Sequence, residues 1–139
     1  MRQIEPLNLN LSFLDTNIIL YLLSADAAKA DKAESIVASG GVISVQVLNE
    51  VTSVCRRKLK MPWCEIETVL AAVKSACKVV PLTIATHETA VKIAQRYDIS
   101  FYDANICAAA ILSGADSLVS EEMHDGMRVD GITIENPFR

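Results

Sequence analysis

Acidic side chains stand at four places in the sequence where a strand is expected to end or a helix to begin. The first is Asp15, which directly follows the apolar pair Phe13-Leu14 and precedes an apolar helical pattern. In open α/β sheets, ligands bind at the edge formed by the carboxyl ends of the strands. Asp15 can therefore belong to a ligand site, or it can serve only as the N-cap that accepts backbone N–H bonds from its helix.

The second acid, Glu50, lies in the helix expected to follow Ser44, at the border of an apolar stripe that includes Val47 and Val54. Val54 occupies the i+4 position, so a local ion pair of the usual kind does not account for Glu50. Arg57 shares its side of the helix two turns later. The alternative is a solvated glutamate at the rim of the stripe.

The third acid, Asp103, falls on the same side of a predicted helix as Ile106, Cys107 and Ala110. A buried carboxylate is costly unless it is paired, hydrogen-bonded or bound to a metal. Ser100 and Asp103 also have the spacing of a capping box, in which the acid reaches back to the N-cap. A capping acid normally points outward, so the apolar stripe predicts a buried acid with a partner.

The fourth acidic place is the segment 120–126, just after the expected strand 117–119, and it contains Glu121, Glu122 and Asp125. Acidic loops are usually only solvated, so this segment is informative mainly beside the other acids. Carboxylates that meet at one sheet edge repel one another and raise one another's pKa. A divalent cation is the simplest compensation, and oxygen ligands favour Mg²⁺ or Mn²⁺ over zinc.

Strand-like and helix-like segments alternate along the chain with short connections. The expected strands are 13–14, 42–43, 78–80, 117–119 and 132–134. The expected helices run from Asp15 to about Ser24, from Asp26 to about Ala38, from Ser44 to about Leu59, from Pro62 to about Ala76, from Thr86 to about Tyr97 and from Phe101 to about Leu112. This alternation predicts an α/β fold with three α/β/α layers and a short central parallel sheet of four to five strands.

The length of 139 residues and the hydrophobic content of 51% indicate one domain with a sizeable core, expected at 11–139 after a lead-in at 1–10. The mean hydropathy is +0.29, yet no apolar stretch approaches the ~20 residues of a membrane span. No signal peptide is indicated. None of the four cysteines forms a CxxC pair, and Cys55 and Cys107 fall on apolar helical faces, so buried free thiols and a reducing cytoplasm are expected.

The formal net charge of −4 argues against a general nucleic-acid binder. Four basic residues nevertheless cluster near one predicted helix end: Arg56, Arg57, Lys58 and Lys60. They can contact a phosphate backbone, or they can simply complement the helix dipole. Acidic residues that hold a divalent metal also count differently once the ion is bound.

Five short blocks of the sequence, spread over most of the chain from Ser12 to Phe138, resemble those of the PIN-domain nucleases. They are Leu14-Asp15-Thr16-Asn17, Ile43-Ser44-Val45-Gln46-Val47-Leu48-Asn49-Glu50, Ser100-Phe101-Tyr102-Asp103-Ala104, Leu118-Val119-Ser120-Glu121-Glu122 and Asn136-Pro137-Phe138. Within that family, the chain is most similar to the VapC-type toxins of bacterial toxin–antitoxin pairs. The order and spacing of the blocks carry the resemblance.

The resemblance implies that Asp15, Glu50 and Asp103 are metal ligands. The family's fourth acid stands two residues after a Ser or Thr and is usually aspartate, whereas this sequence has Glu122. Because glutamate reaches one methylene further, Glu121 or Asp125 remains an alternative source of the fourth carboxylate.

Polar neighbours of these acids also match the family. The resemblance implies that Thr16, Asn17 and Ser120 orient the carboxylates. It does not require either histidine: His87 lies next to the cap of its expected helix, and His124 lies in the acidic loop without the partners of a catalytic triad.

The resemblance implies an endoribonuclease that uses Mg²⁺, or Mn²⁺, and leaves a 5′-phosphate and a 3′-hydroxyl. A metal ion at Asp15 and Asp103 would acidify a bound water and steady the charge on the phosphate. A cognate antitoxin is the implied partner, with Tyr21, Leu22 and Trp63 as candidate contacts, and a homodimer is the implied assembly. The alternatives are a housekeeping RNA-processing nuclease and an inactive protein-binding module.

Overall fold

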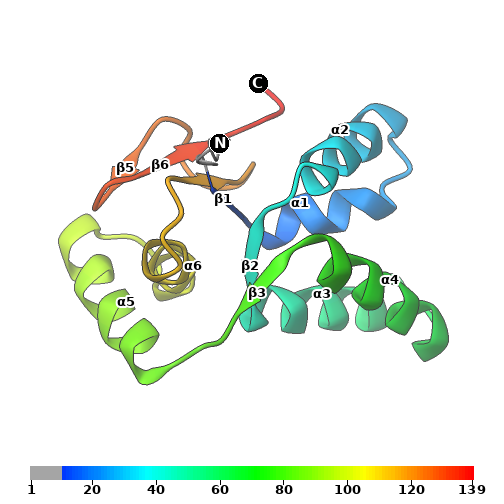
Figure 1. Cartoon of the computed structure of the whole chain (residues 1–139), viewed down its shortest axis with the longest axis horizontal. Coiled ribbons are helices and arrows are strands. Elements are labelled where there is room, and N and C mark those ends of the chain that lie inside the picture. The colour runs from blue at the N-terminus through cyan, green and yellow to red at the C-terminus, as the bar shows by residue number, and fades with distance from the viewer. Residues whose placement is uncertain (1–10) are drawn as a thin grey trace, which may run out of the picture.

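A single six-stranded sheet with helices on both sides organises the chain in a computed structural model, which describes residues 11–139 (Figure 1). The predicted lead-in at 1–10 lies outside the described residues. The strands are β1 Ser12–Leu14, β2 Val42–Ser44, β3 Lys78–Val80, β4 Ser117–Val119, β5 Arg128–Val129 and β6 Ile132–Glu135. The helices are α1 Thr16–Leu20, the 3₁₀ turn η1 Tyr21–Leu23, α2 Ala27–Ala38, α3 Val45–Arg57, α4 Trp63–Ala76, α5 Ile84–Tyr97 and α6 Phe101–Leu112.

The strand order is β3-β2-β1-β4-β6-β5, and every neighbouring pair is parallel except the β5–β6 hairpin. The α/β class is therefore confirmed, but the prediction of four to five strands was too low by one. The extra strand, β5, has only two residues. It is joined to β6 by the turn residues Asp130 and Gly131. Their φ angles are 45° and 92°, and positive values at both positions are typical of a two-residue hairpin turn.

Strand order reverses between β1 and β4, the two central strands. β1 leads towards β2 and β3 on one side, whereas β4 leads towards β6 and β5 on the other. Phe13 is in register with Val42 of β2 and with Leu118 of β4. Ligands in open α/β folds bind at such a switch point, outside the carboxyl ends of the strands. Asp15 immediately follows β1 at this place.

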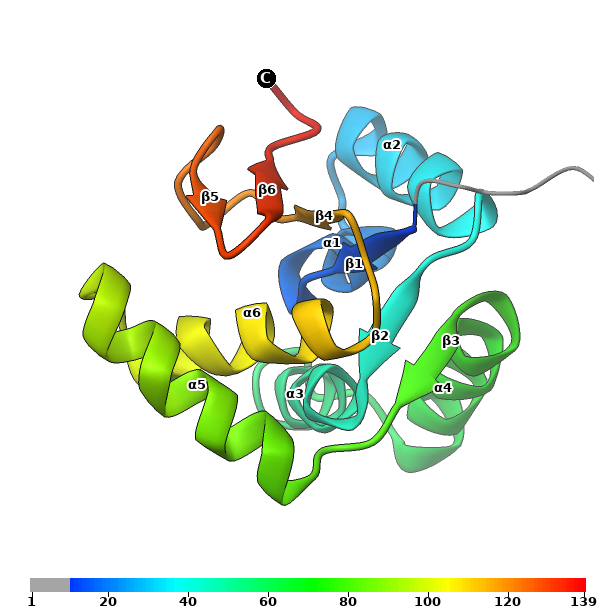
Figure 2. The same cartoon turned by 60° about the vertical axis from the view of Figure 1, so that its left-hand side comes forward.

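Helices α1 to α4 lie to the right of the strands in Figure 1, and α5 and α6 lie to the left. Figure 2 shows α6 running beside β1 and β4, with α5 as an outer layer. The residues that α6 buries against the sheet and α5 are small or apolar, and Ala104, Ile106, Cys107 and Ala108 are all fully buried. This packing sets the first turn of α6 near the end of β1.

Side-chain caps start most of the helices, as the sequence predicts. The oxygen atoms of Asp26, Ser44 and Ser100 accept backbone N–H bonds at the starts of α2, α3 and α6. The start of α5 was predicted two residues late. Thr83 and Thr86 form a reciprocal capping box there, so the helix begins at Ile84.

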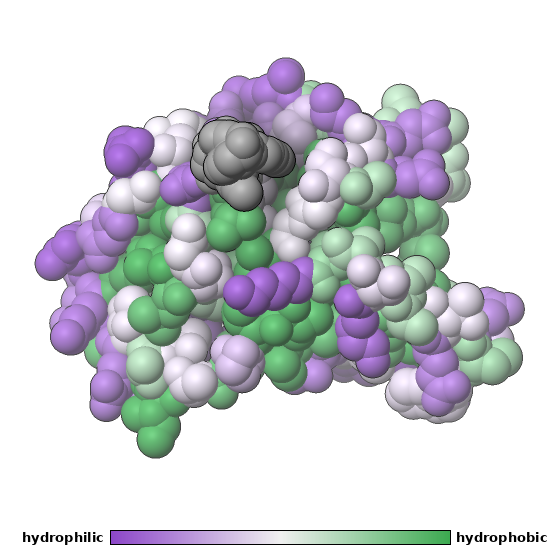
Figure 3. Space-filling view, viewed as in Figure 1, coloured by the Kyte–Doolittle hydropathy of each residue, from purple (hydrophilic) through white to green (hydrophobic). Residues whose placement is uncertain are grey.

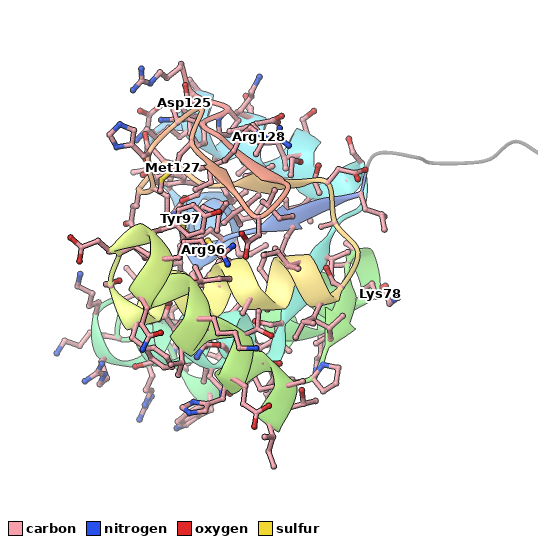
Figure 4. All side chains as sticks on the ribbon, turned by 90° about the vertical axis from the view of Figure 1, so that its left-hand side faces the viewer. Lys78, Arg96, Tyr97, Asp125, Met127 and Arg128 are labelled. Atoms are coloured by element: carbon pink, nitrogen blue, oxygen red, sulfur yellow. The ribbon has the colours of Figure 1, made fainter. Side chains whose placement is uncertain are left out.

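The β5–β6 hairpin is tied to the end of α5 by polar side chains (Figure 4). Arg96 donates to the Asp130 carboxylate at 2.8 Å, and the Tyr97 hydroxyl donates to the same oxygen at 2.8 Å. The Asp130 backbone N–H donates to the Tyr97 hydroxyl in return. These bonds hold the hairpin turn, although it contributes only a two-residue strand.

Gly41, the residue before β2, lies close to β1. A Cβ atom at this position would lie 3.0 Å from Leu14 Cδ1 and 3.2 Å from the Ser12 carbonyl oxygen. Because Leu14 is fully buried, Gly41→Ala is expected to lower the free energy of unfolding by about 1–3 kcal/mol. Urea denaturation of this variant beside Ser75→Ala, an exposed change on α4, tests this, and equal midpoints would contradict it.

Cys55 and Cys107 are buried free thiols, as predicted, and burial raises the pKa of Cys107 to about 12. Across residues 11–139, the helices are all too short or too polar to cross a membrane.

Candidate functional site

Asp15 lies at the centre of a buried hydrogen-bond network between the ends of β1 and β4. Its Oδ1 accepts the backbone N–H of Thr16 at 2.7 Å. Its Oδ2 accepts the hydroxyl of Ser120 at 2.8 Å and the side-chain amide of Asn17 at 3.2 Å. The N-cap interpretation of Asp15 is therefore confirmed, because its Oδ1 accepts the first N–H of α1. Its Oδ2 is bound by Asn17 and by Ser120, which is distant in sequence.

Burial dominates the electrostatics of Asp15, which is only 4% exposed. It raises the pKa of Asp15 to about 6, although the bonds from Ser120 and Thr16 oppose the rise. The negative charges of Glu122 and Asp103 raise the pKa further. Three acids that are separated in sequence thus influence one another at the switch point of the sheet, and the field there favours a cation.

Ser120 and Asn17 connect Asp15 to the loop that follows β4. The Ser120 hydroxyl oxygen accepts the backbone N–H groups of Glu122 and Met123, both at 3.2 Å. The Asn17 carbonyl oxygen accepts the N–H of Glu121 at 3.1 Å. Ser120 and Asn17 are both buried, so the position of this loop is fixed relative to the Asp15 carboxylate.

Asp103 and Glu122, whose charges act on Asp15, both line a cavity of about 460 Å³. The expectation of a buried Asp103 was wrong, because its side chain is half-buried and lines this cavity. Of the two hydrogen bonds of the predicted capping box, only one is formed. The hydroxyl of Ser100 accepts the N–H of Asp103 at 3.0 Å, which leaves the Asp103 carboxylate directed to the cavity.

Glu50 is half-buried on α3 and lies next to Tyr102, the residue before Asp103. Burial raises the pKa of the Tyr102 hydroxyl, and the Glu50 carboxylate raises it further. The carboxylates that raise the pKa of Asp15 are those of Glu122 and Asp103. Glu50 therefore lies beside Tyr102 and is not among the carboxylates that act on Asp15. The sequence reasoning had given Tyr102 no role.

Glu121 and Asp125, the alternative sources of the fourth carboxylate, are bound elsewhere. Glu121 accepts the hydroxyl of Tyr21 and forms an ion pair with Lys29 at 3.2 Å. The bond from Tyr21, and then that from Lys29, holds the pKa of Glu121 below its ordinary value. Asp125 accepts the backbone N–H of Asn136 at 2.7 Å. Of the three acids, Glu122 is the one beside Asp103.

The basic cluster is exposed around the end of α3. Arg56 lies over the ring of Trp63 at 5.1 Å and donates to the Met61 carbonyl at 3.0 Å. Arg57 is seven residues from Glu50, which places it about 10 Å along the helix. Lys58 and Lys60 complete the cluster. Arg56 thus has a local structural role, while the cluster as a whole stays at the surface.

The three candidate partner contacts lie in different surroundings. Leu22 lines an apolar groove of about 430 Å³ between η1, α2 and α4, with Val37, Val69 and Val73. Figure 3 shows this hollow with hydrophobic residues in it. Tyr21 instead packs edge-on against Phe138, with ring centroids 5.2 Å apart. Trp63 is 53% exposed at the start of α4.

The donor atoms of the site suit a hard cation. Asp15, Asp103 and Glu122 offer only oxygen, and the buried Oγ1 of Thr16, the residue after Asp15, has no hydrogen-bond partner. Within residues 11–139, no three His, Cys, Asp or Glu side chains are grouped closely enough to hold an ion as they stand. Mg²⁺ fits this arrangement, because it commonly uses one or two carboxylates and keeps several waters.

The sequence matches the PIN domain family over residues 12–124. The chain belongs to the PIN-domain family. The matched span includes Asp15, Glu50, Asp103 and Glu122, so all four acids of the site lie within the PIN domain. A comparison with curated proteins found no match.

Solved structures with the same fold include toxin–antitoxin proteins. A toxin–antitoxin complex from Klebsiella pneumoniae matches with a TM-score of 0.70 and 21% identity, over 91% of this chain and 97% of the other. VapBC2 from Rickettsia felis, bound to a DNA fragment from its promoter, matches with 0.67 and 20%, over 91% and 98%. Mycobacterium tuberculosis VapC20, a sarcin-ricin loop cleaving toxin, matches with 0.58 and 22%, over 77% and 86%. At these sequence identities, the matches show that this chain has the same fold as the three proteins.

Proposed function

We propose that this PIN domain is a metal-dependent endoribonuclease and the toxin of a toxin–antitoxin pair. The observation that carries the proposal is the Asp15 carboxylate, buried at the switch point with its pKa raised by burial and by Glu122 and Asp103. A site that concentrates negative charge in this way gains stability from a divalent cation. Solved structures of the same fold, one of them an RNA-cleaving toxin, support the choice of substrate.

The residues that would hold Mg²⁺, or Mn²⁺, are Asp15, Asp103 and Glu122. The ion would supply positive charge for the phosphate and make a bound water more acidic. Ser120 and Asn17 keep Asp15 oriented through their hydrogen bonds, and Glu50 lies beside Tyr102. In this proposal, Glu50 orients a group at the phosphate or helps to hold a second ion.

RNA and an antitoxin are the proposed partners. The exposed basic cluster at the end of α3 stands about two turns from Glu50 on the same helix, so it can contact phosphates that lead to the site. The apolar groove between η1, α2 and α4 offers a surface for an antitoxin segment. The Klebsiella pneumoniae structure of the same fold is a toxin–antitoxin complex, which supports this assignment. A homodimer belongs to the same proposal.

Expression of the chain in bacteria without an antitoxin tests the proposal. We expect growth arrest that Asp15→Ala relieves, and Mg²⁺-dependent cleavage of RNA by the purified protein. Cleavage without growth arrest would point to a housekeeping nuclease. A protein that binds no Mg²⁺ and cuts no RNA would contradict the proposal and favour a protein-binding module.

Glu122→Gln and Glu121→Gln are a matched pair, because the two acids are adjacent but face different neighbours. We expect Glu122→Gln to weaken Mg²⁺ binding about tenfold or more, since it removes a charge beside Asp103. Glu121→Gln is expected to keep Mg²⁺ affinity within about threefold, because its partners are Tyr21 and Lys29. Calorimetric titration with Mg²⁺ gives both values, and the reverse ranking would show that Glu121 supplies the fourth carboxylate.

A further inference from the structure

A second part of the site is the apolar cavity that adjoins the acids. Its volume is about 460 Å³, within the range of small-molecule sites. Its apolar wall consists of Ile99, Met123, Met127 and Ile134. Its polar side groups are Asp103, Glu122 and His124. The cavity therefore joins a hydrophobic surface directly to two of the carboxylates proposed to bind Mg²⁺.

The wall of this cavity is held in place by strand β6. The Ile134 N–H donates to the Met127 carbonyl at 2.9 Å, and the Gly126 N–H donates to the Ile134 carbonyl at 2.7 Å. Met123 and Ile134 are buried, with 8% and 2% exposure. In Figure 4, Met127 lies between the loop of Asp125 and the end of α5 at Tyr97. The cavity is thus formed before any ligand binds.

The lining of the cavity restricts the chemistry of its occupant. The lining residues include no Lys or Arg, so the cavity does not attract a phosphate. The four apolar residues offer no hydrogen bonds to a sugar, so hydrogen bonding is confined to the side of Asp103, Glu122 and His124. An uncharged group with a large apolar surface fits this wall, and in RNA that group is the base.

We propose that this cavity binds the nucleobase next to the phosphate that lies at Asp15 and Asp103. The thioethers of Met123 and Met127 contact the ring, as methionine sulfur does with aromatic groups. The exposed His124 imidazole at the mouth stacks on an unpaired base, a common mode of single-stranded RNA recognition. This inference rests on the proposed nuclease function, and it makes an unpaired base part of the substrate.

Methionine methyl NMR tests base binding without any cleavage. The chain has four methionines, and two of them, Met123 and Met127, line the cavity, whereas Met61 lies at the end of the α3–α4 connection. With ¹³C-methyl methionine and no divalent metal, adenosine or cytidine is expected to shift the signals of Met123 and Met127. Ribose is expected to shift neither. Met123→Leu and Met127→Leu assign the two signals.

Two results of the titration would overturn the inference. One is the absence of a shift at Met123 and Met127 at millimolar nucleoside in a protein that cuts RNA. The other is an equal shift at Met61, which would indicate non-specific contact. Because this readout needs no catalysis, a protein that fails to cut RNA but shows the two shifts would count against the proposed function alone.

Cleavage kinetics provide the second arm. His124→Ala is expected to raise the KM for RNA about tenfold, the size of one stacking contact, and to change kcat less than threefold. His87→Ala, an exposed histidine on α5, is the matched control and should leave both constants unchanged. For an RNA with an abasic residue beside the cut, the KM of the wild-type protein should rise by the same tenfold. His124→Ala should cause no further rise in KM for this RNA. Equal KM values for all four combinations would contradict the inference.

Discussion

Asp103→Asn is expected to lower Mg²⁺-dependent RNA cleavage by more than about a hundredfold while the protein stays folded. Changing a residue that only orients a metal ligand typically lowers metal affinity or activity 10–100-fold. Asp103 is proposed to contact the ion itself, so a larger loss is expected. Its carboxylate opens into the cavity beside Asp15, and its contribution to the start of α6 is a backbone N–H that asparagine retains.

The control for this variant is Asp98→Asn, which makes the same change at an exposed residue. Asp98 ends α5 in a left-handed conformation, with φ of 53°, and asparagine adopts this conformation readily. Asp98→Asn should therefore cleave RNA like the parent. Circular dichroism and the urea midpoint should match the parent for Asp103→Asn. A folded Asp103→Asn protein that cuts RNA at the parental rate would show that the assigned acids are not the active site.

The part of the site that could be predicted from sequence is the part fixed by strand ends. Asp15 and Ser120 each directly follow a short apolar run, and the parallel order of β1 and β4 places those two ends side by side. The hydrogen bond from Ser120 to Asp15 then follows from adjacent strands and needs no further packing information. The same reasoning predicted the caps at Asp26, Ser44 and Ser100, because a cap depends on residues within one turn.

The features of the site that could not be predicted are those that depend on where a side chain points in the folded chain. Glu121 and Glu122 are adjacent and chemically alike, and only the position of Tyr21 and Lys29 on the other side of the loop separates their roles. Helical periodicity placed Asp103 on an apolar face, but it could not show that the face opens into a cavity at the first turn. Tyr102 was missed because its neighbour, Glu50, lies on another helix.

The hairpin of β5 and β6 is an intermediate case. Its signal, Asp130-Gly131, is present in the sequence and is typical of a two-residue turn. The strand before it, Arg128-Val129, is too short for an alternating pattern to appear. Its place at the sheet edge depends on the bonds from Arg96 and Tyr97 to Asp130, which join segments more than thirty residues apart.

The metal-free protein should lose stability as the pH rises, because Asp15 is harder to ionise in the folded state than in the unfolded state. Its folded pKa is about 6 against an ordinary value of 3.8. Below pH 3.8 the group is protonated in both states and costs nothing. Between pH 3.8 and about 6 the unfolded chain is ionised while the folded protein keeps its proton, so the free energy of unfolding falls across this window by about 3 kcal/mol in total and levels off above pH 6. The difference between parent and Asp15→Asn in urea denaturation at pH 4.5 and pH 7.5 measures this contribution.

Mg²⁺ should reverse the loss, since binding requires the ionised carboxylate. We expect 10 mM Mg²⁺ to raise the urea midpoint of the parent at pH 7.5, to have a smaller effect at pH 5, and to leave Asp15→Asn almost unchanged. The buried network makes this specific to Asp15, because its two oxygens are already held by Thr16, Asn17 and Ser120 and little ordering is left for the ion to impose. A Mg²⁺ effect of equal size at both pH values, or one that persists in Asp15→Asn, would mean that the ion binds elsewhere.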